Sequence, residues 1–193
     1  MPDPRIDDLY DLIDGIEVAM VTTRRPDGQL VSRAMETQRR TAGADLWFVT
    51  SIESQKFEEL AFDPHVNVSY YRDRTREWVS VSGKAILSRD RDLIRGLYKP
   101  DWSVWFRAEE GTGKGAPGTK AGTADDPRIA LILVEAQAVT YFKRDRALPL
   151  VLFDLARAMV GGKAPDVGDE REVSADELRA AARRHQSENE LRG

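Results

Sequence analysis

The sequence contains no cysteine and only two histidines, His65 and His185, among its 193 residues. Without cysteine the chain forms no disulfide, zinc–thiolate site or iron–sulfur cluster, and it has no cysteine nucleophile. Two histidines so far apart in sequence argue against a metal site built from several histidines of one chain. Long hydrophobic runs are also missing. The longest, 129–134 and 150–153, fall far below the roughly 20 residues of a membrane-spanning helix.

A large excess of charge of either sign is missing as well. The 29 lysines and arginines nearly balance the 33 aspartates and glutamates, which gives a net charge of −4. This balance excludes a generally basic nucleic-acid-binding protein, although it leaves a local basic patch open. Residues 1–10 are acidic and unlike a secretory signal. We therefore expect a soluble, cytoplasmic protein with no nucleic-acid or membrane partner.

Short apolar segments separated by turn residues predict a mainly β protein. Pro26-Asp27-Gly28 is typical of a hairpin turn, and Gly83 inside a strand predicts a bend or bulge. A parallel doubly wound sheet needs a helix after nearly every strand, and none is expected before Ser54. We predict six strands in a small antiparallel barrel with flanking helices. The expected strands are 17–23, 30–38, 46–51, 66–70, 78–87 and 128–142.

Helical spacing of apolar residues predicts helices between and after these strands. They begin at Pro4, after an N-cap at Ser54 and after a cap at Ser88, and a fourth covers 148–160. Residues 163–193 hold 14 charges and few large apolar side chains, and they include a capping box at Ser174 and Glu177. We therefore divide the chain into a domain over 1–162 and a charged C-terminal extension over 163–193, partly helical or disordered.

The segment from Trp47 to Lys56 runs from a strand through hydroxyl residues into a predicted helix start. Free backbone N–H groups and the helix dipole attract anions at such a start, and Lys56 adds a full positive charge. A phosphate would fit there. The alternative is that Ser54 only caps the helix and Lys56 is solvated.

Arg33 lies on the same strand face as Val31 and Met35. An arginine on an otherwise apolar face is costly unless it is paired. It either grips a phosphate through two hydrogen bonds or forms a salt bridge to a nearby carboxylate.

Three aromatic residues, Trp102, Trp105 and Phe106, precede a glycine-rich loop over 108–127. Such residues stack on flat ligands or fill a core or subunit interface, and packing is the favoured interpretation. The sequence has no Gly-x-Ser-x-Gly or His-Glu-x-x-His motif. If the protein is an enzyme, its reactive group would come from a cofactor.

Several short motifs follow one another in a characteristic order. They are Ser32-Arg33-Ala34-Met35, Phe48-Val49-Thr50, Ser54-Gln55-Lys56, Asp63-Pro64-His65-Val66-Asn67-Val68, Tyr70-Tyr71, Val79-Ser80-Val81-Ser82-Gly83-Lys84, Asp126-Pro127-Arg128-Ile129 and Tyr141-Phe142. In this order they resemble the pyridoxamine 5′-phosphate oxidase-like split barrels, and among these the general stress protein branch. The resemblance covers roughly residues 6–173, and it implies a six-stranded antiparallel split β-barrel with flanking helices.

The resemblance also implies FMN at the interface of a homodimer. By position in the motifs, Arg33 and Lys56 would hold the FMN phosphate with help from Ser54 and Gln55. Other matched positions would contact the ring system: Met35 in the ring pocket, the backbone of Val49 and Thr50 along the isoalloxazine edge, Trp78 from the partner subunit, and Phe142 near the flavin.

Two departures separate this chain from the oxidases of pyridoxamine phosphate. Gln38 stands where those enzymes carry a lysine for the substrate phosphate, and 147–152 replaces their Arg/His-bearing segment. The resemblance therefore implies a flavin-dependent oxidoreductase acting on another small substrate, rather than an enzyme of vitamin B6. Two alternatives stay open. One is a non-catalytic flavin-binding or stress-sensing module, and the other is the use of FAD or a deazaflavin.

Overall fold

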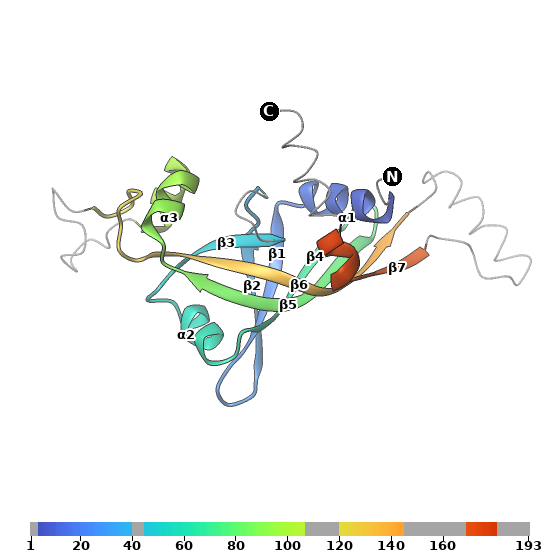
Figure 1. Ribbon diagram of the computed structural model, residues 1–193, viewed down its shortest axis with the longest axis horizontal. Helices are drawn as coiled ribbons and strands as arrows, with labels where there is room; N and C mark the ends of the chain where they lie inside the picture. The colour runs from blue at the N-terminus through green and yellow to red at the C-terminus, as the bar shows by residue number, and fades with distance from the viewer. Residues whose placement is uncertain (1–3, 40–44, 107–119, 145–168, 181–193) are drawn as a thin grey trace, which may run out of the picture.

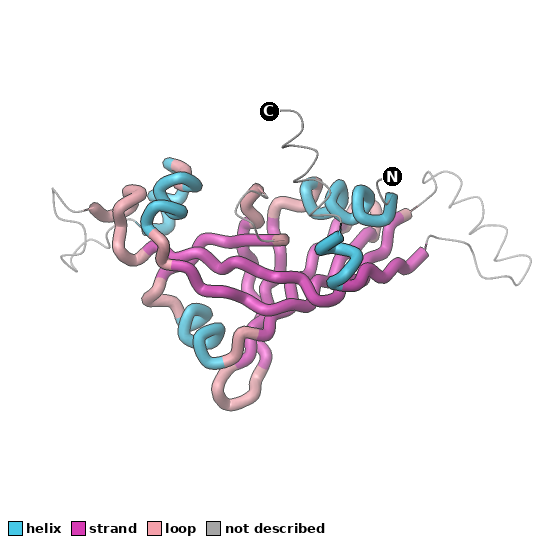
Figure 2. Tube along the Cα trace, viewed as in Figure 1, coloured by secondary structure: helices cyan, strands magenta, loops and turns pink. Residues whose placement is uncertain are grey.

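The computed structural model describes residues 4–39, 45–106, 120–144 and 169–180 (Figure 1). Seven strands and a few short helices make up this part of the chain (Figure 2). The strands are β1 (Val18–Arg24), β2 (Leu30–Glu36), β3 (Leu46–Ser51), β4 (His65–Arg72), β5 (Glu77–Ser88), β6 (Ile129–Lys143) and β7 (Asp169–Ser174). The helices are α1 (Pro4–Asp14), α2 (Gln55–Phe62), α3 (Arg91–Leu97) and the 3-10 helix η1 (Pro100–Phe106).

All strand pairs are antiparallel, in the order β2-β1-β4-β5-β6-β3. The predicted mainly β antiparallel architecture is therefore confirmed. β2 and β3 are the two ends of this order, and the Gln38 N–H donates to the Trp47 carbonyl at 3.2 Å where the two ends meet. The sheet thus closes on itself at this point as a split barrel.

A seventh strand, β7, was not among the six expected. It pairs with β6 along residues 138–143, while β3 pairs with the same strand along 129–134. Its sequence is charged at four of six positions, and only Val173 turns into the core, so the apolar alternation that marks a strand is nearly absent. Residues 175–180 are helical, and the Ser174–Glu177 capping box is confirmed by hydrogen bonds in both directions. The helix predicted over 148–160 lies outside the described residues.

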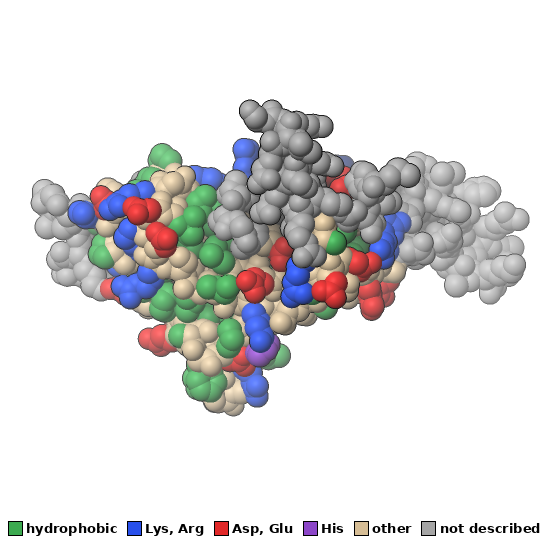
Figure 3. All heavy atoms as spheres, viewed as in Figure 1, with side chains coloured by type: hydrophobic (Ala, Val, Ile, Leu, Met, Phe, Trp, Pro, Cys, Tyr) green, Lys and Arg blue, Asp and Glu red, His purple; other side chains and the backbone are tan. Residues whose placement is uncertain are grey.

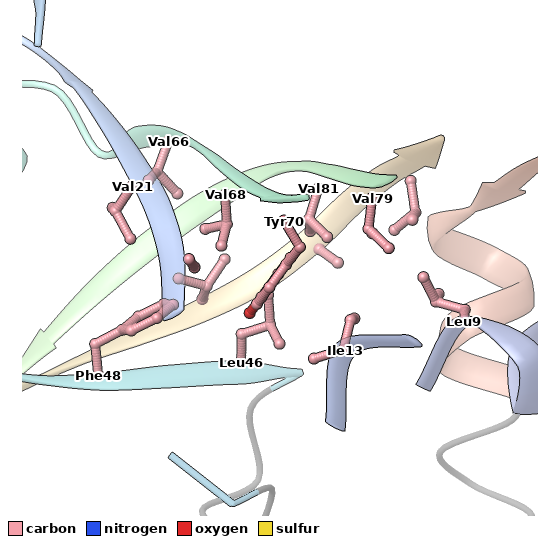
Figure 4. Close-up of a cluster of buried hydrophobic side chains, with 14 of the residues drawn as sticks. Leu9, Ile13, Val21, Leu46, Phe48, Val66, Val68, Tyr70, Val79 and Val81 are labelled. Carbon is pink, nitrogen blue, oxygen red and sulfur yellow. The ribbon is translucent and has the colours of Figure 1, made fainter. Parts of the chain in front are cut away.

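Alternating side chains from the strands fill the interior of the barrel, and α1 covers one end of it (Figure 4). Leu9 and Ile13 of α1 point toward this core. The fully buried residues include Val68, Tyr70 and Phe48. Burying such side chains supplies the main favourable free energy of folding.

A second apolar cluster lies on the other face of β3 and β6, where Trp47, Ile129 and Leu131 meet α3 and η1. β3 and the first half of β6 are therefore buried on both faces, as the continuous apolar start of the last predicted strand indicated. Asp90, rather than Ser88, caps α3, because its carboxylate accepts from the N–H groups of Asp92 and Leu93.

Gly83 marks a bulge, as predicted. The register between β5 and β6 shifts between Ser82 and Gly83, and a Cβ at Gly83 would lie 2.3 Å from the Glu135 carbonyl oxygen. Only glycine permits this close approach of two backbones.

None of the described helices has the length and apolar character needed to cross a membrane.

Candidate functional site

A cavity of about 270 Å³ opens in the split between β2 and β3. Three kinds of element line it: the facing edges of the two end strands, the first turn of α2, and η1. The lining residues are Ala34, Met35, Glu36, Gln38, Val49, Thr50, Ser51, Lys56, Trp102, Trp105 and Phe106. Four of the predicted site residues, Met35, Val49, Thr50 and Lys56, are thus brought together.

One wall of the cavity is aromatic. Trp102 and Phe106 are buried in the second cluster, whereas Trp105 is 79% exposed at the cavity. The packing favoured by the sequence is therefore right for two of these residues, and the stacking alternative suits Trp105. The buried Trp102 Nε1–H has no hydrogen-bond partner in the described part of the chain. Such a donor is costly to bury alone and suits an acceptor on a ligand.

Lys56 is the one cation among the described lining residues. Burial lowers the pKa of its ammonium group, the nearby Arg33 charge lowers it further, and Glu59 opposes the shift. An incompletely solvated cation of this kind gains more from an incoming anion than a fully hydrated one does.

Ser54 precedes α2 but does not cap it with its side chain. Its hydroxyl donates to the Ser51 carbonyl at 2.7 Å and lies 3.0 Å from the Thr50 hydroxyl. Ser54 therefore occupies the N-cap position that the sequence predicted, but the alternative that its side chain caps the helix is wrong. Because the first N–H groups of a helix have no intrahelical partner, the start of α2 at Gln55 and Lys56 keeps backbone donors available to an acceptor.

Arg33 forms the salt bridge that the sequence left as one of two alternatives. Its Nη2 donates to Glu59 at 2.8 Å, and its Nη1 donates to the Thr23 hydroxyl at 2.9 Å. Thr23 in turn donates to the second Glu59 oxygen at 2.6 Å. This ring of bonds lowers the pKa of the Glu59 carboxyl, mainly through Arg33. Glu59 was not predicted from the sequence, because nothing in the pattern of a helix shows that one of its glutamates is buried.

Trp78 and Phe142 lie at the other end of the sheet. They are direct partners across β5 and β6, and both are half-buried. Phe142 is 11 positions along β6 from Leu131, the partner of Val49, a span of roughly 35 Å at the rise of a β-strand. One chain therefore does not bring these aromatic residues to its own cavity.

Gln38 is buried beside the cavity, and its amide oxygen accepts from the Lys99 ammonium at 2.9 Å. No pattern in the sequence indicated this partner, because Lys99 follows α3, far along the chain. The pair fills the position that the resemblance associated with a substrate-binding lysine.

Comparison with known proteins places this split barrel in a family. The chain matches the family described as pyridoxamine 5′-phosphate oxidase like over residues 4–166, and it belongs to that family. It is 33% identical over 180 residues to Protein bli-3 of Neurospora crassa, with 92% of this chain and 83% of that protein covered.

Two solved structures share the fold. A general stress protein 26 from Jannaschia sp. CCS1 has a TM-score of 0.66 at 18% identity, covering 89% of this chain and 98% of that one. A pyridoxamine 5′-phosphate oxidase-related, FMN binding protein from Nostoc punctiforme PCC 73102 has a TM-score of 0.60 at 14% identity, covering 74% and 86%. The expected family and fold are thereby confirmed.

Proposed function

We propose that this protein binds FMN in the split between β2 and β3 and uses it as a flavin-dependent oxidoreductase on a small substrate. The observation that carries the proposal is the composition of the cavity, which joins an aromatic wall to a desolvated Lys56. A flat ring with an anionic tail matches both ends. The family as a whole and the FMN-binding relative from Nostoc support a flavin.

Within this proposal the tail of the cofactor lies at the start of α2. Lys56 supplies a charge, and the Gln55 amide and the backbone N–H groups at the start of α2 supply donors beside it. The Thr50 and Ser54 hydroxyls hold the preceding turn in place, because Ser54 donates to the Ser51 carbonyl and Thr50 donates to Ser54. Anions bind well at such helix starts. Arg33 lies behind Lys56, and its pairing with Glu59 fixes the direction of its guanidinium and offsets its charge.

The ring system then lies between Met35, Val49 and the aromatic wall. The outer edge of β3 takes no part in the pairing with β6, and because the Trp47 carbonyl on this edge faces β2, the backbone groups of Val49, two residues on, also face the split. These groups, with Trp102 Nε1–H, offer donors and acceptors to the polar edge of a flavin. A bound flavin supplies hydride transfer, while the residues of this chain orient the ring and exclude water from it.

We also propose a homodimer, in which the partner completes the cavity. At about 270 Å³ the cavity is slightly smaller than typical ligand sites, which begin near 300 Å³, and it is open at Trp105. Far from it, Tyr71, Trp78 and Phe142 form a row across three strands, and Tyr71 is 53% exposed. Docking this row against a second copy covers apolar surface and brings aromatic side chains to the other subunit's flavin.

Replacing Trp78 tests the dimer. Trp78→Glu places a charge in the middle of the row, so light scattering should report monomers, and FMN affinity should fall with dimerisation. Ile86→Glu, on the same strand but outside the row, is the matched control and should stay dimeric. A monomeric wild-type protein that binds FMN tightly would contradict the proposed dimer.

A non-catalytic flavin-binding or stress-sensing module is the second candidate. It is favoured by the small number of titratable groups at the cavity, which are Glu36 and Lys56 among the described lining residues. General acid–base catalysis needs a group of this kind within reach of the substrate. Oxidation of NAD(P)H faster than with free FMN supports the oxidoreductase, whereas its absence with several electron acceptors supports the module.

The absorption spectrum of the purified protein tests flavin binding directly. A flavin spectrum, or quenching of flavin fluorescence on titration, is the expected result. Mass analysis of the released chromophore then separates FMN from FAD and from a deazaflavin. A colourless protein that takes up none of these cofactors would overturn the proposal.

A further inference from the structure

A buried carboxylate, Glu59, lies behind the cationic end of the cavity. Its side chain is 6% exposed, and both of its oxygens are bonded, one to Arg33 at 2.8 Å and the other to Thr23 at 2.6 Å. Arg33 and Thr23 are themselves joined at 2.9 Å. Three elements, β1, β2 and α2, therefore meet in one closed ring of hydrogen bonds.

The hydrogen bonds of Glu59 change the net charge that the cavity offers to an anion. Lys56 and Arg33 carry two positive charges close enough to act on each other, and Glu59 cancels one of them. The net charge of the three groups is therefore +1. A phosphate monoester carries about −1.5 to −2 at pH 7. The cluster thus falls short of neutralising the terminal phosphate of FMN, whereas it matches a singly charged phosphodiester.

Glu59 leaves Arg33 able to take part in binding. A guanidinium has five N–H donors, and the bonds to Thr23 and Glu59 use two of them. Arg33 is also 23% exposed. The carboxylate therefore fixes the direction of the guanidinium and withholds charge at the same time. Replacing the carboxylate with an amide of the same shape separates these two effects.

Resting on the proposed flavin site, we propose that Glu59 is a specificity-determining residue, which weakens the hold on a doubly charged phosphomonoester relative to a singly charged phosphodiester. FMN and FAD differ in this way at the phosphate that is attached to the ribityl chain: in FMN it is a terminal monoester, whereas in FAD it carries one charge and shares a diphosphate with a second, more distant charge. Riboflavin has no phosphate, and it reports the ring site alone.

The test compares the three flavins in wild-type protein and in Glu59→Gln. The amide keeps a hydrogen-bonding side chain of the same length beside Arg33 and removes the negative charge. We expect FMN to bind about tenfold more tightly, FAD about threefold more tightly, and riboflavin as before; tenfold corresponds to about 1.4 kcal/mol. Glu58→Gln is the matched control, because it removes the same charge from an exposed position of α2 and should alter none of the three.

The outcomes separate the two levels of the proposal. If wild-type protein binds none of the flavins, the proposed function fails. If it binds FMN and riboflavin but Glu59→Gln leaves FMN affinity unchanged or lowers it, the assignment of Glu59 is wrong and the flavin site stands. Glu59→Met, which also removes the charge but preserves volume, gives the same comparison if the amide variant does not fold, as its thermal unfolding would reveal.

Discussion

The indole of Trp102 packs edge-on against Trp47, with ring centroids 6.1 Å apart and an interplanar angle of 73°. This contact fixes η1 to the outer face of β3, so that the aromatic wall stands beside the edge that lines the split. Tyr98 adds a second edge-on contact to Trp102 at 5.6 Å. Aromatic pairs of this geometry contribute beyond the area that they bury.

Trp102 and Trp105 should therefore respond differently to truncation. Trp102→Ala removes a buried ring, and we expect it to lower the free energy of unfolding by about 3–5 kcal/mol. Trp105→Ala removes an exposed ring and should change stability by no more than about 0.5 kcal/mol. Flavin affinity should nevertheless fall in Trp105→Ala. Urea unfolding and flavin titration measure the two effects, and a fully stable Trp102→Ala would contradict the packing role.

Lys56 should affect the phosphate of the ligand and not its ring. In Lys56→Met a side chain of similar length loses its charge, so FMN affinity should drop by about 2 kcal/mol, the size of a charge-assisted contact. Riboflavin affinity should stay within twofold. Equal losses for the two ligands would place the phosphate elsewhere.

Two glycines should respond to alanine in opposite directions. Gly83→Ala drives a Cβ into the Glu135 carbonyl at the bulge, and we expect a loss of about 1–3 kcal/mol of stability. Gly96→Ala meets no atom within 4 Å in α3, so it should gain about 0.4–1 kcal/mol by stiffening the unfolded chain. Thermal unfolding of both variants provides the comparison.

Glu59 should make the free energy of unfolding depend on pH in the acidic range. Arg33 holds the pKa of this carboxyl below its ordinary 4.5, so the unfolded chain takes up its proton first as pH falls. The contribution is complete above about pH 5 and is lost as pH falls through the lowered folded pKa. Urea unfolding between pH 7 and pH 3 should therefore show a shallower acid decline in Glu59→Gln than in wild-type protein. Identical declines would mean that folding does not lower the pKa of the Glu59 carboxyl.

The sequence predicted the fold better than it predicted the partners within the site. Alternation and turn residues located β1 to β6, because those strands bury one face or both. β7 escaped because Val173 is its single buried apolar side chain. The flanking apolar residues of Arg33 showed that the arginine needed a partner. They could not show that Glu59 supplies it, because that pairing forms only when α2 packs on β1.

The aromatic residues of the site show the same limit. Motif order placed Trp78 and Phe142 in a flavin role, and the sheet puts them at its far end. Such an assignment depends on a second molecule, which no spacing within one chain describes. The position of Trp105 at the cavity depends on the contact between Trp102 and Trp47. This contact joins segments that are more than 50 residues apart in sequence.

β6 divides one edge between two neighbours, β3 along its first half and β7 along its second. Truncating the chain before Asp169 would remove β7. The backbone N–H and C=O groups of residues 138–143 that pair with it would then be left unpaired at the edge of the sheet. Exposed edge strands of this kind pair with strands of other molecules. By covering this edge, β7 thus protects the protein against edge-to-edge aggregation.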